Sequence, residues 1–546
     1  MWSHIVQLWE SLQVELHGKY SNKRVLELSN YASNTSWLHV ITVLIVTPLP
    51  CILVIVLADI LPLADPADGV SGNTLFFLRN AYTTFVQSFI CIHQFRISVP
   101  ILPYPIRRAI VNALYITVGD IGIQYAVASS TSFPLPFSLV TTTLPWITLV
   151  TISMTIEWRK KIRETPGAKV MLTNVMKVMA CQVALETLYP IYYCVFQMLS
   201  DEGQMGFALL LPVIKLALRY VFTRTVVHLT DEMPEVIVFN VEVFNALFVS
   251  YCMQNSPSVW TTLGLMFVDI VLIILSVHDM EPTSHGLKEL EQRIDRERCW
   301  NKGTNTGNRV PTTLDRIQTL LEQKSSLQYM VASARVELEQ VQTDLGSERR
   351  VPEQIKSGRN KISVTPVVTT KIPNNAELLP VASHLRASAR IHPAVESAGK
   401  LLQKFSVKVR YTRKVQILLC MAEFLLLLNY VEVVVPLVFS VYMLATYQLP
   451  NREYYSQLHG MTQSDLLQTL GNVMFYCSLQ LVSLLLLVFI LQRKLDLSPI
   501  HQLSFVLEKQ YSAVQAKLVF WVLFTTQASL QHNGYDYNLR FPWLDN

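Results

Sequence analysis

Apolar runs long enough to cross a lipid bilayer alternate with short polar segments along most of the chain. A hydrocarbon core of about 30 Å takes roughly 20 helical residues. Eight such runs fall within residues 37–277 and two more within 413–494. The pattern predicts an all-α protein, a polytopic transmembrane helix bundle of about ten spans. Residues 495–546 hold one further apolar stretch, 518–530, which is short and interrupted by polar groups. We expect an interfacial or re-entrant helix there, with an eleventh span as the alternative.

The composition supports a membrane protein with a soluble appendage. Of the 546 residues, 51% are hydrophobic and 16% charged, whereas soluble domains are roughly a quarter charged. The net charge of +5 is not gathered into a basic stripe, so we expect no nucleic-acid partner. The eight cysteines are scattered and form no CxxC pair. They indicate neither a disulfide framework nor a zinc site, and nothing in the sequence points to a cofactor.

Lys and Arg gather in every second loop. Arg107 and Arg108 follow the second apolar run and a basic patch at 158–169 follows the fourth, while the loops after runs one, three, five and seven contain neither residue type. Cytoplasmic loops of membrane proteins carry the excess of Lys and Arg. The alternation therefore predicts an integral membrane protein with a cytoplasmic N-terminus and, after eight crossings, a cytoplasmic loop at residues 278–412. The charges do not identify which membrane.

Three segments outside the predicted spans have distinct patterns. Residues 1–36 place apolar residues at helical spacing, which predicts an amphipathic helix on the membrane surface or on the protein itself. Within 313–345, apolar residues recur on heptad positions from Ile317 to Leu345, so a short coiled coil could pair with a second copy or a partner helix. The alternative is a helix that folds back on its own chain. The composition of 351–380 is that of a flexible linker.

Ionisable residues inside the apolar runs are the main candidates for function. An ionised side chain at bilayer depth costs roughly 2.5–3.5 kcal/mol unless it meets a partner or water. The runs between Leu211 and Val277 carry both signs of charge, so we expect these groups to face one another as a polar seam inside the bundle. The candidate residues are Asp120, Glu186, Lys215, Arg219, Glu242, Asn245, Asp269 and Glu432.

The seam has two interpretations. The functional one is a path for an ion or substrate, with acidic groups binding a cation or proton and Lys215 as counter-ion. The structural one is that the charges lock helices together, or that Arg219 extends to the membrane surface. We found no phosphate loop, HExxH, GxSxG or EF-hand pattern, and therefore expect no enzyme. A transporter-like or channel-like protein is the first hypothesis, and a membrane-anchored scaffold or receptor acting through its coiled-coil loop is the second.

Two stretches carry a resemblance. They are LPVIKLALRYVF with LTDEMPEVIVFNVEVFNALFVSYCMQNSPS (211–222 and 229–258), and YVEVVVPLVFSVYMLATYQLPNREYY (430–455). They resemble a group of uncharacterised multi-pass membrane proteins abundant in oomycetes. The resemblance implies a polytopic membrane domain, and it implies no activity and no catalytic or binding residue.

Overall fold

The computed structural model describes residues 18–199, 203, 207, 210–226, 229, 231–255, 259–301, 313–314, 316–322, 392–495 and 498–534. The chain divides into two compact units. Unit 1 comprises Met1–Gly286, Thr312–Leu314 and Val415–Asn546, and unit 2 comprises Leu287–Pro311 and Asp315–Lys414. Several sequence predictions fall outside the described residues: the start of the amphipathic segment (1–17), the heptads beyond residue 322, the linker 351–380 and the last twelve residues.

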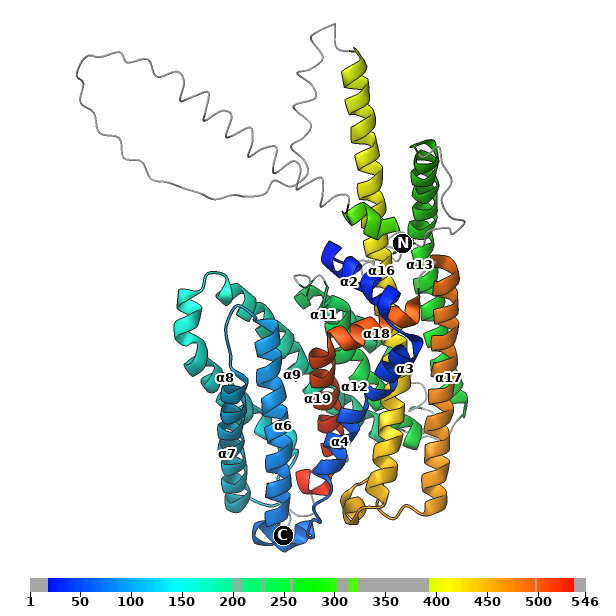
Figure 1. The fold of residues 1–546 in the computed structure, drawn as a ribbon. Coiled ribbons are helices and arrows are strands. Elements are labelled where there is room, and N and C mark those ends of the chain that lie inside the picture. Colours follow the sequence, from blue (N-terminus) through cyan, green and yellow to red (C-terminus); the bar gives the residue numbers. More distant parts are fainter. Residues whose placement is uncertain are drawn as a thin grey trace, which may run out of the picture. The chain divides into compact units, whose positions relative to one another are not determined.

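The described residues are helical almost throughout and contain no strand, only an isolated bridge between Tyr455 and Leu530. The helices drawn in Figure 1 are α2 (Asn22–Asn34), α3 (Trp37–Val46), α4 (Leu49–Ala58), η2 (Pro66–Asp68), α5 (Gly69–Gly72), α6 (Thr74–Ser98), α7 (Ile106–Ser130), α8 (Ser138–Glu164), α9 (Ala168–Met198), α11 (Leu211–Val226), α12 (Met233–Asn255), α13 (Val259–Asn301), α16 (His392–Tyr447), η4 (Pro450–Tyr454), α17 (Gln463–Leu495), α18 (Pro499–Lys509), α19 (Tyr511–Gln527) and η5 (Gln531–Asn533).

Seven helical segments of the described residues are long and apolar enough to cross a membrane. They are Trp37–Ala58, Ile106–Ser130, Ser138–Glu164, Ala168–Leu188, Met233–Ser250, Val407–Tyr447 and Gln463–Arg493. The chain thus has the helices of a multi-pass membrane protein. The count of ten spans stays a prediction, because α11, for example, has only 16 residues. The predicted boundaries after residues 277 and 412 fall inside the continuous helices α13 and α16.

The interior of unit 1 is built around α12 and α19, which contact each other (Figure 1). Every residue from Met233 to Ser250 is buried, and so is every residue from Leu518 to Phe524, which spans about two helical turns. Helix α19 also packs on α4 and α6. An interfacial helix leaves one face toward headgroups and water. The part of α19 from Leu518 to Phe524 is enclosed by protein, whereas Tyr511 at its start is exposed. The interfacial or re-entrant assignment of 518–530 stays a prediction.

Four polar loops meet at one end of unit 1. The amide of Leu63 donates to Asn451 Oδ1 at 2.8 Å, and the amide of Phe137 donates to the Gly534 carbonyl at 3.0 Å. His532 Nε2 lies 2.9 Å from the carbonyl oxygen of Ala64. The loops that follow α4, α7, α16 and α19 are therefore neighbours. Which side faces the cytoplasm stays a prediction.

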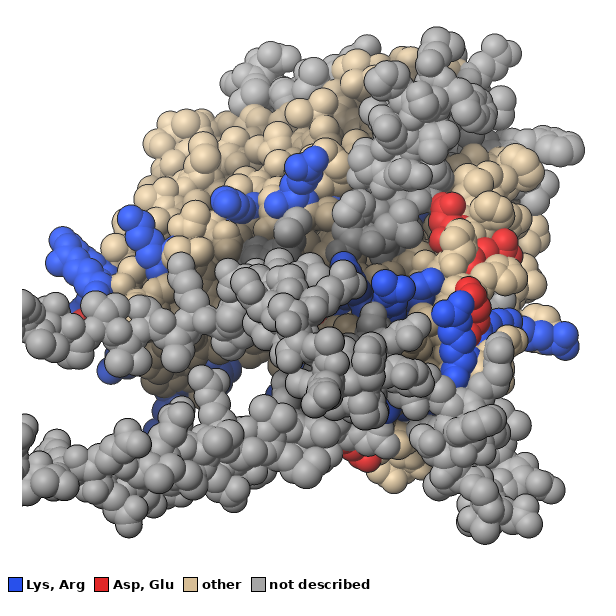
Figure 2. Space-filling model, turned by 90° about the horizontal axis from the view of Figure 1, so that it is seen from above, with Lys and Arg blue, Asp and Glu red and all other residues tan. Residues whose placement is uncertain are grey.

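Basic residues lie at another end of the same unit, where α6 leads into α7 and α8 into α9. Lys161 Nζ donates to the Pro103 carbonyl at 3.1 Å and to Glu157 at 2.7 Å. Arg108 reaches the same Glu157 carboxylate at 3.0 Å. Figure 2 shows a face on which the Lys and Arg side chains of the described residues are spread out and exceed the Asp and Glu side chains. These charges flank the ends of candidate spans, which is where the charge bias of membrane proteins is found.

In unit 2, the carboxylate of Glu291 on α13 joins two other segments. It lies 3.2 Å from Arg316 Nη1 and accepts a hydrogen bond from Tyr411 on α16 at 3.0 Å. Ile317 and Leu320, the first positions of the predicted heptads, are buried. The rest of the predicted coiled coil lies outside the described residues, so its pairing stays a prediction.

Candidate functional site

Lys215 lies at the centre of a buried group of charges contributed by four helices. Its Nζ is 2.5 Å from Glu432 Oε1 on α16, 2.9 Å from Glu242 Oε2 on α12 and 3.8 Å from Asp269 Oδ1 on α13. The residue itself, on α11, is 3% exposed. The expectation that charges of consecutive spans face one another is thus met by the geometry of these four residues.

Arg219 extends this group by one helical turn. Residues four apart lie on one helix face, so Arg219 presents its side chain on the same side of α11 as Lys215. Its Nε is 2.5 Å from Glu242 Oε1, and its guanidinium lies 5.8 Å from the ring centre of Phe424. The alternative in which Arg219 extends to the membrane surface is wrong, because the side chain is buried among protein groups. We call Lys215, Arg219, Glu242, Asp269 and Glu432 the central cluster.

Helix α17 closes the cluster on the side of Asp269. Gln480 Nε2 donates to Asp269 Oδ2 at 3.1 Å and to the Tyr476 hydroxyl at 2.9 Å. The side chain of Asp269 is 15% exposed, whereas the Glu242 side chain is fully buried. Asp269 is therefore more exposed than the buried Glu242 and gives the central cluster access to its surroundings.

The charges of the central cluster do not balance. It contains three carboxylates and two cations, so with all five groups ionised it carries one excess negative charge. Glu432 Oε2 receives no hydrogen bond from any group that the structure describes. Burying an uncompensated charge costs several kcal/mol. Among the described residues, the cluster therefore has one carboxylate more than it has cations.

Asn245 follows Glu242 by three residues on α12, and both are buried. Its Oδ1 receives no hydrogen bond within the described part of the chain. The spacing of three residues places Asn245 and Glu242 on the same side of α12. The Asn245 side chain is a neutral amide, so it adds polarity and no charge to this face of α12.

Asp120 and Glu186 do not belong to the central cluster. They lie on α7 and α9 and line a separate small cavity together with Asn80 of α6 and Gln527 of α19. The predicted polar seam is therefore two sites within unit 1. The sequence could not separate them, because helical spacing tells which residues share a face and not which helices are neighbours.

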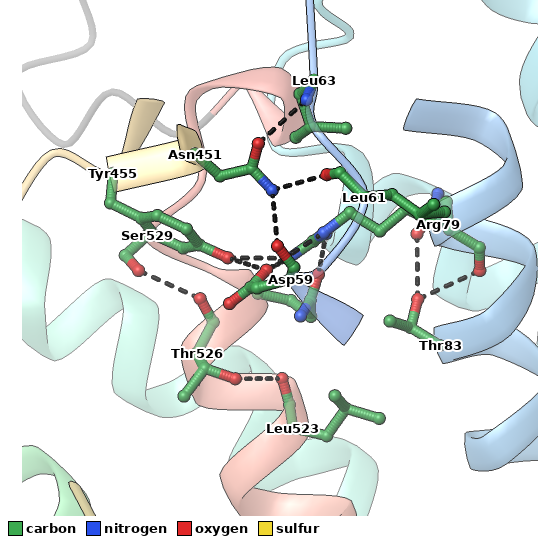
Figure 3. A network of polar contacts seen from close by, with 12 residues as sticks. Asp59, Leu61, Leu63, Arg79, Thr83, Asn451, Tyr455, Leu523, Thr526 and Ser529 are labelled. Atoms are coloured by element: carbon green, nitrogen blue, oxygen red, sulfur yellow. Dashed lines mark hydrogen bonds and ion pairs between the residues drawn. The ribbon is translucent and has the colours of Figure 1, made fainter. Parts of the chain in front are cut away.

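A third polar network, which the sequence analysis did not predict, lies near the end of unit 1 where the loops meet (Figure 3). Arg79 donates to Asp59 Oδ1 from Nη2 at 2.5 Å and from Nε at 3.2 Å. The hydroxyls of Tyr455 and Tyr442 donate to the same carboxylate at 2.6 and 2.9 Å. Asn451 donates to the main-chain carbonyl of Asp59 at 2.9 Å. In the sequence, the indication of this network was Arg79, a charged residue within an apolar run. Its partner Asp59 stands at the end of α4, where an aspartate is ordinary.

Two further buried pairs are also balanced one to one. Arg24 Nη2 contacts both oxygens of Glu423 at 2.8 and 2.9 Å, and Lys517 lies 2.7 Å from Glu235. Together with Arg79 and Asp59 they join distant parts of unit 1. Balanced pairs of this kind hold helices together and need no further ion. The central cluster differs from them by its extra carboxylate.

No group of three or more His, Cys, Asp or Glu side chains among the described residues could hold a metal ion. No protein family, curated protein or solved structure matches the chain. Inferences about function therefore rest on the buried charges themselves.

Proposed function

We propose that this chain is a multi-pass membrane transporter whose central cluster takes up and releases a proton. The observation that carries this proposal is the unequal count of charges: three carboxylates meet two cations in a site closed off by α11, α12, α13, α16 and α17. A proton on one carboxylate makes the cluster neutral. Its loss leaves one uncompensated negative charge.

The backbone beside Glu432 supports this proposal. Pro436 lies inside α16, four residues after Glu432. Proline has no N–H, so the carbonyl oxygen of Glu432 lacks its usual helical partner. Helix α16 stays continuous through Pro436, and freed backbone carbonyls of this kind contribute to ion coordination in transporters. Glu432 thus combines a side-chain oxygen without a hydrogen-bond partner among the described residues and a main-chain oxygen that lacks its usual helical donor.

A purely structural role for the central cluster makes a different prediction, and α16 itself offers the control. Glu423 and Glu432 lie on the same helix and each is 1% exposed. Glu423 belongs to a balanced pair with Arg24, whereas Glu432 belongs to the unbalanced central cluster. Glu423→Gln and Glu432→Gln therefore remove the same charge from equally buried positions.

The experiment reconstitutes the purified protein into liposomes loaded with a pH-sensitive dye and imposes a potassium diffusion potential. We expect wild-type protein to carry protons faster than protein-free vesicles do. Glu432→Gln should lower the rate per folded molecule by about tenfold or more, and Glu423→Gln should change it by less than about twofold. Wild-type vesicles that are no faster than protein-free ones would refute proton transport. Equal rates for the two variants would indicate that the central cluster only holds the helices together.

A further inference from the structure

A second polar cavity, separate from the central cluster, lies between α6, α7, α8, α9 and α19. Its volume is about 40 Å³. A cavity needs roughly 10–15 Å³ on this measure to hold one water molecule. The space is therefore large enough for a single dehydrated ion with one or two waters, and too small for an organic solute.

Two carboxylates line this cavity without a basic partner. Asp120 and Glu186 are each 5% exposed, and none of the described lining residues is Lys, Arg or His. Asp120 Oδ1 receives no hydrogen bond from any described group. A buried carboxylate without a hydrogen-bond donor or a positive charge is strongly unfavourable. The cavity supplies the space in which a cation can remove that cost.

The threonines of the lining present oxygen lone pairs, whereas Asn80, Gln87 and Gln527 also carry amide N–H groups. The hydroxyls of Thr142 and Thr143 donate their protons to the main-chain carbonyls of Ser138 and Leu139, at 2.7 and 2.5 Å. The hydroxyl of Thr83 donates to the carbonyl of Asn80 at 3.0 Å. A hydroxyl has one proton and two lone pairs. Because each proton is already donated to a carbonyl, each hydroxyl oxygen can act toward the cavity only as an acceptor or ligand. Such a lining suits a hard cation and repels an anion.

One positive charge on α6, which contributes to the lining, is already neutralised. Arg79 donates to Oε1 of Gln527, which also lines the cavity. The guanidinium is held by the carboxylate of Asp59 on its other side. Because that pair is balanced, Arg79 does not compensate Asp120 or Glu186.

We propose that this cavity binds one sodium ion, with Asp120 and Glu186 as charged ligands and the threonine oxygens as neutral ones. Calcium takes six to eight oxygen ligands, usually with several carboxylates, and magnesium retains most of its waters. The cavity has two carboxylates and room for one or two waters, and one sodium ion together with a proton on Asp120 or Glu186 makes the site neutral. This proposal goes beyond the proposed function and does not rest on it, since sodium can bind whether or not the central cluster moves protons.

The test measures the thermal unfolding midpoint of the full-length protein in detergent, with NaCl replaced stepwise by choline chloride at constant ionic strength and pH. A ligand that binds only the folded state raises the midpoint in a saturable manner. We expect that rise for wild type with Na⁺ and its loss in Asp120→Asn. The control Glu423→Gln also removes a buried carboxylate, and although it lowers the midpoint it should keep the response to Na⁺.

A second measurement covers the case in which Asp120→Asn does not fold. Wild-type protein is equilibrated with ²²Na⁺, and bound label is displaced with unlabelled Na⁺ or with choline. Displacement by Na⁺ alone supports the site. Absence of bound label, equal midpoints in NaCl and choline chloride, or stabilisation by Ca²⁺ and not by Na⁺ would each overturn the assignment.

Discussion

Replacing Asp59 by asparagine should destabilise the folded protein severely. The side chain keeps its size, but the carboxylate charge that faces Arg79 is removed. Arg79 is 1% exposed and Asp59 fully buried, so water cannot take over. Removing one partner of a buried ion pair costs about 3–5 kcal/mol, because the other charge is left uncompensated.

The hydrogen bonds around Asp59 bear on the size of this effect. Four donor groups converge on its carboxylate, two from Arg79 and one each from Tyr442 and Tyr455. Hydrogen bonds to charged groups are worth about 1.5–3 kcal/mol each, but the asparagine carbonyl oxygen still accepts some of them. The uncompensated guanidinium therefore sets the expected loss, and we predict about 3–5 kcal/mol for Asp59→Asn.

The assay is equilibrium unfolding in mixed micelles, following loss of helical circular dichroism. Asp68→Asn, at an exposed position in the same loop, is the matched control and should stay within about 0.5 kcal/mol of wild type. The double variant Asp59→Asn/Arg79→Met removes both charges and should recover most of the loss. A loss below about 1 kcal/mol for Asp59→Asn, or a double variant no more stable than the single one, would refute the reasoning.

Three further predictions concern the ends of the helical bundle. Burial lowers the pKa of His532 to about 4, so its contribution to stability is complete above the ordinary value near 6.5 and is lost as pH falls toward about 4, on the order of 3 kcal/mol in all; His532→Phe should remove this part of the pH dependence of unfolding. Gly534 has a φ of +62°, and an added Cβ would lie 2.0 Å from the carbonyl oxygen of Leu135, so Gly534→Ala should destabilise by more than about 1 kcal/mol in the same assay. Asn34, an exposed residue in an Asn-Thr-Ser sequon, should remain without sugar in microsomes if the N-terminus is cytoplasmic, and glycosylation there would reverse the predicted orientation.

The sequence was informative about residues that share a helix and uninformative about helix neighbours. Lys215 and Arg219 are one turn apart, and Glu242 lies on the next apolar run, so their meeting follows from spacing and from the cost of unpaired charge in lipid. Glu432 joins them from 217 residues away. It was a candidate only because it is a charge within an apolar run.

The networks that were missed have partners with no local signal. Arg24 and Glu423 are 399 residues apart, and Arg24 stands in a polar segment where a surface position is the ordinary expectation. Asp59 terminates α4, where a polar residue is usual. Such pairings depend on which helices pack together, which no periodicity within a single helix encodes.

The enclosure of α12 has a consequence for how the chain is made. Glu235 on α12 and its partner Lys517 on α19 are separated by 282 residues. At a synthesis rate of about 5–20 residues per second, Lys517 leaves the ribosome roughly 15–60 s after Glu235. During that interval the carboxylate has to be neutralised by a proton, by lipid headgroups or by a chaperone. A chain terminated before α19 would lack both the partner of Glu235 and the helix that covers α12, so we expect it to assemble incorrectly.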